Sequence, residues 1–135
     1  MSKRDIGLLV MRVGLGIMFV LHGIPKIVGG SDAWKGLAQM VVPGVDGFAA
    51  SALGLSAAIA EILGGILLAT GCFYPIGMVM LIGVMAGATL AKLTGGGYDF
   101  LSFAQTVGWP LELMIVFIGL LLTGPGRLVL RMKSG

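Results

Sequence analysis

Four long apolar stretches run along the chain, separated by shorter segments that contain glycine, proline or charged residues. The apolar stretches cover approximately residues 6–22, 50–71, 75–92 and 109–124. Each stretch is close to the ~20 residues that a helix needs to cross a lipid bilayer. The pattern therefore predicts four membrane-spanning helices within one domain, residues 1–135.

Glycine and proline mark the expected ends of these helices. Gly23 suits a helix C-terminus and Pro25 cannot continue a helix, so the first span is predicted to end before Pro25. Pro75 and Pro110 fit the first positions of the third and fourth spans, and the sequence GPGR, 124–127, ends the fourth. No small-x-small cleavage site follows the first stretch, so it is interpreted as a retained span and not as a signal peptide.

The two long connections have apolar patterns of their own. In AWKGLAQMVV, Trp34, Leu37 and Val41 share one helical face, which predicts a short helix at the membrane surface. The aromatic segment YDFLSFAQTVGW, 98–109, is expected to lie at the same interface. The predicted fold is an all-α integral membrane protein, an antiparallel four-helix bundle with short interfacial helices in its outer loops.

Composition narrows the class of protein. The chain is 57% hydrophobic and 11% charged, whereas soluble domains are about a quarter charged. Its mean hydropathy is +1.04, which indicates that its main partner is the lipid bilayer. The net charge of +3 is carried mostly near the ends and does not indicate a nucleic-acid-binding protein. One cysteine, Cys72, cannot form an internal disulfide or a zinc cluster, and no metal site is expected.

Basic residues predict the orientation, because cytoplasmic segments are enriched in lysine and arginine. The terminal segments hold the larger share: Lys3, Arg4, Arg127, Arg131 and Lys133. The two long connections hold the smaller share: Lys26, Lys35 and Lys92. Both termini are therefore expected on the cytoplasmic side of a bacterial plasma (inner) membrane.

Small residues recur at helical spacing and predict close contacts between the spans. On the second span, four of them recur at every fourth position, and a fifth lies in the neighbouring row of the same helix. On the third span, two glycines form a GxxxG pair. The residues are Ala52, Ser56, Ala60, Gly64, Gly65, Gly83 and Gly87.

Two ionisable residues fall inside the apolar stretches. Arg12 lies about 10 Å along the first span from Asp5. Glu61 lies at a similar or slightly greater depth in the second span. Because a charge in lipid is costly unless paired, we expect an Arg12–Glu61 ion pair between these neighbouring spans. The pair could fix only the helix register, or it could line a polar pocket for a proton, a quinone head or another ligand.

Three further residues are candidates for the outer end of the bundle. Glu112 lies in the first turn of the fourth span, where it could simply complement the helix dipole. The same end should hold Lys26 and His22, the only histidine. With Glu112, His22 could relay protons or hydrogen-bond a quinone carbonyl; alternatively it could bond only a loop carbonyl. His22 alone cannot form a metal site.

Three stretches together resemble the DoxX family of small four-span membrane proteins: LLVMRVGLGIMFVLHGIPKIVGG, AAIAEILGGILLATGCFYPIG and WPLELMIVFIGLLLTGPGRLVL. The resemblance covers roughly residues 6–130 and depends on a combination of motifs, which hold Arg12, His22, Gly23, Lys26, Glu61, Gly64, Gly65, Glu112, Gly124, Pro125 and Gly126. The family name comes from a subunit of a membrane thiosulfate:quinone oxidoreductase. The chain departs from the quinone-linked thiol oxidases, whose four-helix bundles are similar, because it lacks their cysteine pairs.

The resemblance implies a membrane subunit of a quinone-linked redox complex that supplies a polar site inside the membrane. The chain would contribute no redox centre of its own; a bound quinone is the one cofactor implied, and a partner protein would supply the redox group. The alternative is a non-catalytic scaffold, assembly or accessory subunit, alone or as a homo-oligomer. Transport of a small solute is a third hypothesis, disfavoured because four spans leave little room for alternating access. Neither the substrate nor the catalytic residues follow from the sequence.

Overall fold

The computed structural model describes residues 1–130, and every regular element in that range is a helix. The predicted all-helical fold is therefore confirmed. The helices are α1 (Lys3–Val28), α2 (Gly30–Val41), α3 (Gly47–Thr70), α4 (Tyr74–Thr94), α5 (Phe100–Thr106) and α6 (Gly108–Thr123). The helices α1, α3 and α4 are each long and apolar enough to cross a membrane. The pair α5 and α6, which meet at 54°, qualifies as a fourth span if it is counted as one broken helix.

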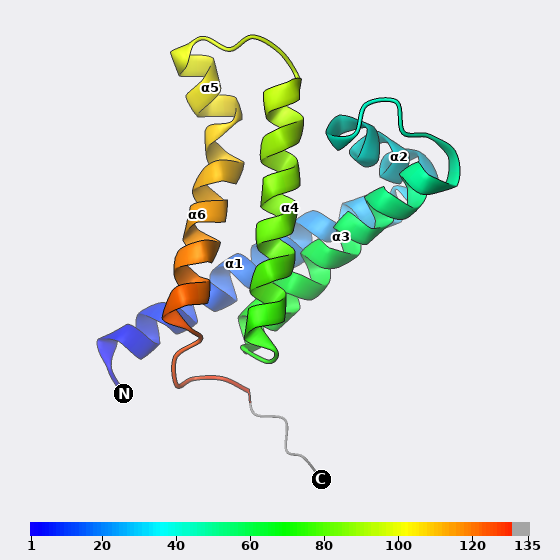
Figure 1. The fold of residues 1–135 in the computed structure, drawn as a ribbon. Coiled ribbons are helices and arrows are strands. Elements are labelled where there is room, and N and C mark those ends of the chain that lie inside the picture. Colours follow the sequence, from blue (N-terminus) through cyan, green and yellow to red (C-terminus); the bar gives the residue numbers. More distant parts are fainter. Residues whose placement is uncertain (131–135) are drawn as a thin grey trace.

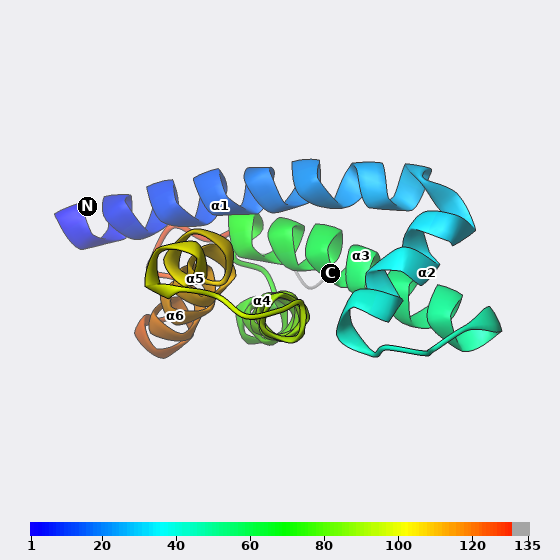
Figure 2. The ribbon, with the colours of Figure 1, turned by 90° about the horizontal axis from the view of Figure 1, so that it is seen from above.

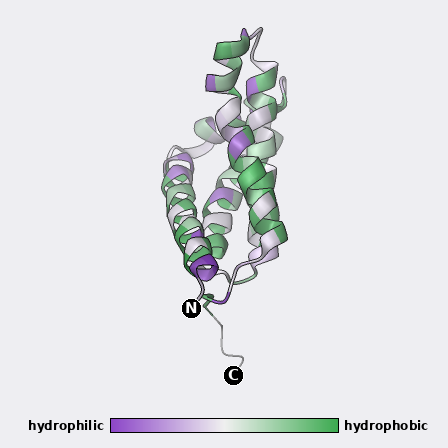
Figure 3. Cartoon of the chain, turned by 90° about the vertical axis from the view of Figure 1, so that its left-hand side faces the viewer, coloured by the Kyte–Doolittle hydropathy of each residue, from purple (hydrophilic) through white to green (hydrophobic). Residues whose placement is uncertain are grey.

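The helices form two layers that cross one another. The helices α1 and α3 run antiparallel and strongly inclined across the upright pair α4 and α6 (Figure 1; Figure 2). The 26 residues of α1 span about 39 Å, which exceeds the ~30 Å hydrocarbon core of a bilayer, so a tilt would fit this helix to the membrane. The 21 residues of α4 span about 31 Å and need no tilt. Hydrophobic residues predominate along the helices, and a hydrophilic turn marks the N-terminal end (Figure 3).

The predicted end of the first span is wrong, because α1 continues through Pro25 to Val28. A proline removes one backbone hydrogen bond of the helix. The helix can tolerate the loss of this bond where the same turn is packed against a neighbouring helix. Gly23 provides this packing: a Cβ added there would lie 2.4 Å from Ile62 Cγ1 of α3. Gly23 is thus a contact position and not a cap, and the chain turns into α2 at Gly30, whose φ is +74°.

Glycines hold the layers together, but at positions that the sequence only partly indicated. A Cβ on Gly65 would lie 2.7 Å from the carbonyl oxygen of Gly16, and a Cβ on Gly64 would lie 2.8 Å from Leu81 Cγ. These contacts join α3 to α1 and to α4. The expected row on α3 is misplaced, however, since Ala52 and Ser56 are exposed and Ala60 is only half-buried. The buried positions of α3 are Ala50, Gly54, Ala58, Glu61, Gly64, Gly65 and Leu68.

An apolar core joins the two layers at the middle of the molecule. The rings of Phe19 on α1 and Phe117 on α6 meet edge to face, with centroids 5.1 Å apart. Met78 and Leu81 of α4 are fully buried beside them. The helix α5 begins at Phe100, and the residue before it, Asp99, accepts hydrogen bonds from the hydroxyl and backbone N–H of Ser102. These bonds hold the pKa of the Asp99 carboxyl below its ordinary value.

Candidate functional site: an ion pair at an apolar cavity

A cavity of about 320 Å³ lies between α2, α3 and α4, next to the last turns of α1. This volume is at the lower end of the range typical of small-molecule pockets. Its walls are almost entirely apolar and include Leu37, Met40, Leu53, Ala57 and Val84. The charged residues of the lining are Lys26, Glu61 and Lys92.

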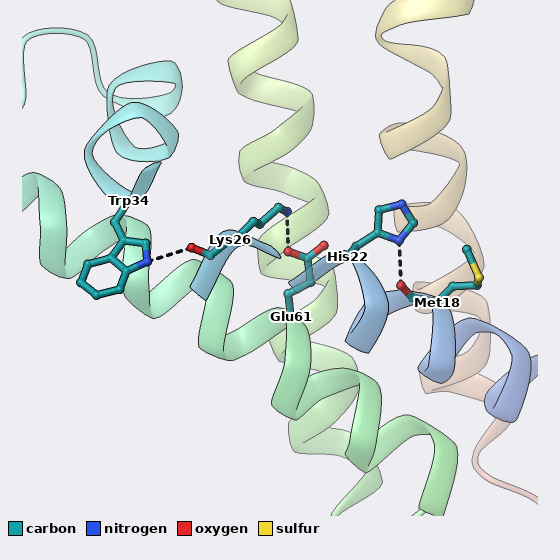
Figure 4. A network of polar contacts seen from close by, with 5 residues as sticks. All are labelled: Met18, His22, Lys26, Trp34 and Glu61. Carbon is teal, nitrogen blue, oxygen red and sulfur yellow. Dashed lines mark hydrogen bonds and ion pairs between the residues drawn. The ribbon is translucent and has the colours of Figure 1, made fainter. Parts of the chain in front are cut away.

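Lys26 and Glu61 form an ion pair at the wall of this cavity, with Nζ and Oε2 separated by 2.5 Å (Figure 4). It is the only ion pair found within residues 1–130. The Glu61 side chain is 5% exposed and that of Lys26 is 34% exposed. Isolated charges are costly in a medium of low polarity, and the pairing lowers that cost for both. The ammonium therefore stabilises a carboxylate that the middle of an apolar helix could not otherwise hold.

The helix α2 is held against the same site by two close contacts. Trp34 Nε1 donates a 2.9 Å hydrogen bond to the backbone carbonyl of Lys26 (Figure 4). A Cβ on Gly54 would lie 1.8 Å from the carbonyl oxygen of Trp34, so only glycine lets α2 approach α3 this closely. Both contacts fix α2 as one wall of the cavity.

The expected Arg12–Glu61 pair does not form. Arg12 is 1% exposed and donates instead to four backbone carbonyls, those of Leu68, Ala69, Pro125 and Leu128. Two of these carbonyls belong to the last turn of α3, where they lack helical partners and form the negative end of the helix dipole. Leu68 is seven residues beyond Glu61, about 10 Å along α3, so the register of the antiparallel helices keeps the two charges apart.

His22 and Glu112 lie outside the cavity lining. His22 is exposed one turn before Lys26 on α1, and its Nδ1 lies 2.7 Å from the carbonyl oxygen of Met18 (Figure 4). Because a carbonyl can only accept, Nδ1 carries the proton and Nε2 of the neutral ring is an acceptor. Glu112 is also exposed, and no ion pair links it to His22 in the described part of the chain. The structure thus joins Lys26 to Glu61 but does not join His22 to Glu112.

Several residues of the site were not indicated by the sequence. Gly83 and Gly87 were expected at a helix contact, yet they line the cavity, and a Cβ on Gly83 would meet no atom within 4 Å. The sequence indicated Lys92 only as one of the basic residues that predict the orientation in the membrane. Trp34 was expected at the membrane surface, and its hydrogen bond to Lys26 has no sequence signal.

The described residues hold no cluster of three or more histidine, cysteine, aspartate or glutamate side chains suited to a metal ion. Cys72 donates through Sγ to the carbonyl of Leu130, away from the cavity. The chemistry available at the cavity is therefore that of one carboxylate and two ammonium groups in apolar surroundings.

The fold and this cavity together define a helical membrane protein with a paired charge in its interior. The chain belongs to the DoxX family, whose model matches residues 7–94. The match includes the helices α1 to α4 that enclose the cavity and ends before Glu112 and the GPGR segment. No curated protein and no solved structure matches the chain.

Proposed function

We propose that this DoxX-family protein is a membrane subunit of a quinone-linked redox complex and that the cavity receives the quinone head. The observation that carries the proposal is the Lys26–Glu61 pair on the wall of an otherwise apolar cavity. A quinone has an apolar ring with polar oxygens, so the ring fits the walls and an oxygen can accept a hydrogen bond from Lys26. A partner protein would supply the redox centre.

The proposed topology places four spans in a bacterial inner membrane, with α5 and α6 counted as one broken span. The N-terminus, the α3–α4 turn and the segment that follows α6 then lie on one side, in agreement with their positions at one end of the molecule (Figure 1). Lys3, Arg4 and Arg127 favour the cytoplasm for that side. Arg131 and Lys133, which add to the same charge, lie outside the described residues. The cavity and α2 would face the outer half of the membrane.

The test is purification of the full chain in a mild detergent, followed by quantification of co-purified quinone and identification of bound proteins by mass spectrometry. The proposal predicts quinone and its reduced form, quantified together, in near-stoichiometric amount, and less of both in a Lys26→Met variant that remains folded. An Arg4→Met variant is the matched control, because Arg4 is an exposed residue at the opposite end of α1. Absence of both quinone and quinol from the wild-type protein, together with a failure to bind either form when it is added, would overturn the proposal.

A non-catalytic scaffold is the second candidate, and one observation favours it. Arg12, a second buried charge, makes only structural contacts, tying α1 to the end of α3 and to the segment after α6. A protein built to hold partners needs this kind of fixed frame. A stoichiometric complex with a non-redox membrane assembly, and no quinone in any preparation, would support the scaffold.

A further inference from the structure

We infer that the cavity is selective for the hydroquinone form of its ligand, because Glu61 requires a hydrogen-bond donor that a quinone lacks. This inference rests on the proposed function and goes further, since it assigns a redox state to the bound molecule. Two features carry the selectivity, a carboxylate oxygen without a partner and an ammonium group with spare donors; a third, a wall of bare helix backbone, accepts the flat ring that both forms share.

The first feature is the second oxygen of Glu61. Oε2 accepts from Lys26, whereas Oε1 has no hydrogen-bond partner among the described residues. No unpartnered polar side-chain atom is fully buried in this part of the chain, so Oε1 retains contact with open space. It points away from Lys26 (Figure 4), and Glu61 itself lines the cavity. A carboxylate oxygen can only accept, so a molecule that satisfies Oε1 must carry an N–H or O–H group.

The second feature is the ammonium of Lys26. It has three N–H donors and gives one of them to Glu61. The pair therefore presents an acceptor and a donor side by side. A hydroquinone hydroxyl donates to the carboxylate and accepts from the ammonium at the same time. A quinone carbonyl accepts from Lys26 alone and leaves Oε1 stripped of water and unpartnered, which is unfavourable.

The third feature is the shape of the α4 wall. A Cβ on Gly83 would meet no atom within 4 Å, and one on Gly87 would meet only Val41 Cγ2 at 3.9 Å. The two glycines thus leave a strip of α4 backbone without side chains beside the charged pair. A flat ring can lie against such a strip, whereas a branched head would gain nothing from it.

The experiment compares two probes, decylubiquinol and decylubiquinone, under anaerobic conditions. The full-length protein in lipid nanodiscs is dialysed against each probe, with empty nanodiscs measuring partition into lipid alone. We expect the wild-type protein to bind the quinol at least about tenfold more tightly, the ratio typical of one charge-assisted hydrogen bond. In Glu61→Gln the amide offers a donor as well as an acceptor, so the ratio should fall to near one.

Glu112→Gln is the matched control, because it makes the same substitution at an exposed carboxylate outside the cavity, and it should keep the wild-type ratio. Equal binding of both probes by the wild-type protein, or tighter binding of the quinone, overturns the inference while the proposed function stands. A Glu61→Gln ratio that equals the wild-type ratio also overturns it. Binding of neither probe removes the proposed function and this inference together.

Discussion

The interior of this protein holds two charged sites that differ in how completely their charges are satisfied. Arg12 directs hydrogen bonds at four carbonyls and is almost fully buried. The Lys26–Glu61 pair makes one bond between its members, leaves the second carboxylate oxygen without a partner among the described residues, and lines a cavity. The two sites lie on the same pair of helices, α1 and α3.

The difference is between a charge whose hydrogen bonds are all made within the fold and a charge that keeps hydrogen-bonding capacity for the proposed ligand. The carbonyls around Arg12 lie at the end of α3 and in the segment after α6, where they would be unsatisfied without a donor. A guanidinium has several N–H donors in a fixed planar arrangement, which suits it to bond several carbonyls at once. Because these carbonyls already occupy its donors, few are left for a ligand. At the cavity the charges are paired well enough to be stable, yet their remaining hydrogen-bonding capacity is open. Burial alone therefore does not distinguish the two sites, whereas their unused hydrogen-bonding capacity does.

The largest expected effect is that of Arg12→Met. Removing the guanidinium leaves several buried carbonyls without donors, so the free energy of unfolding should fall by about 3 kcal/mol or more. Denaturation of the purified protein in mixed micelles, followed by circular dichroism, measures this loss. The contacts of Arg12 with Pro125 and Leu128 should loosen as well, which amide hydrogen exchange in residues 124–130 would reveal.

Arg4→Met is the control for this substitution. Arg4 is exposed and donates one 3.3 Å hydrogen bond to the carbonyl of Thr123, so its loss should change stability by less than about 0.5 kcal/mol. An Arg12→Met protein of unchanged stability that has lost ligand binding would reverse the two roles assigned here.

Sequence reasoning predicted the fold well where the signal was the length of an apolar run. The stretches 50–71 and 75–92 lie close to α3 and α4, because a helix in lipid must satisfy its own backbone over a fixed thickness. It failed at Pro25, where a contact of Gly23 with Ile62 outweighs a helix-breaking residue. The inclination of α1 against α4 also has no local signal, since it depends on which small residues meet across helices.

The site was predictable in its residue types but not in its pairing. Arg12, Lys26 and Glu61 all stood out as charges in or beside apolar runs. Their partners depend on the register of α1 against α3, in which Leu68 and not Glu61, two helical turns earlier on α3, lies beside Arg12. Backbone carbonyls, the actual partners of Arg12, carry no sequence signal at all. The sequence pattern of glycines likewise could not distinguish Gly64, which touches Leu81, from Gly83, which faces the cavity.

A smaller effect is expected from Gly54→Ala, which tests whether α2 is a fixed wall of the binding site. The new Cβ would overlap the backbone of Trp34, so α2 must move away from α3. Overpacking of this kind typically lowers stability by about 1–3 kcal/mol. We expect faster amide exchange in α2 and weaker ligand binding. The control is Gly36→Ala, where a Cβ meets no atom within 4 Å and exchange should not increase. Unchanged exchange in Gly54→Ala would mean that α2 is not held by this contact.

The smallest effect on stability, and the sharpest distinction between the two kinds of glycine, should come from Gly83→Leu. A Cβ at this position meets no atom within 4 Å, so we expect a leucine to extend into the cavity, and it removes the helix penalty of glycine, about 1 kcal/mol. The protein should therefore remain as stable as the wild type, or become slightly more stable, while binding of quinol or quinone falls at least about tenfold. Gly64→Ala should do the reverse, because its Cβ would press on Leu81 and weaken the α3–α4 contact. Unfolding in mixed micelles and nanodisc dialysis measure the two quantities on the same samples. If Gly83→Leu binds the ligand as the wild type does, the ligand does not occupy this cavity, and the open hydrogen-bonding capacity of Glu61 must be satisfied by water.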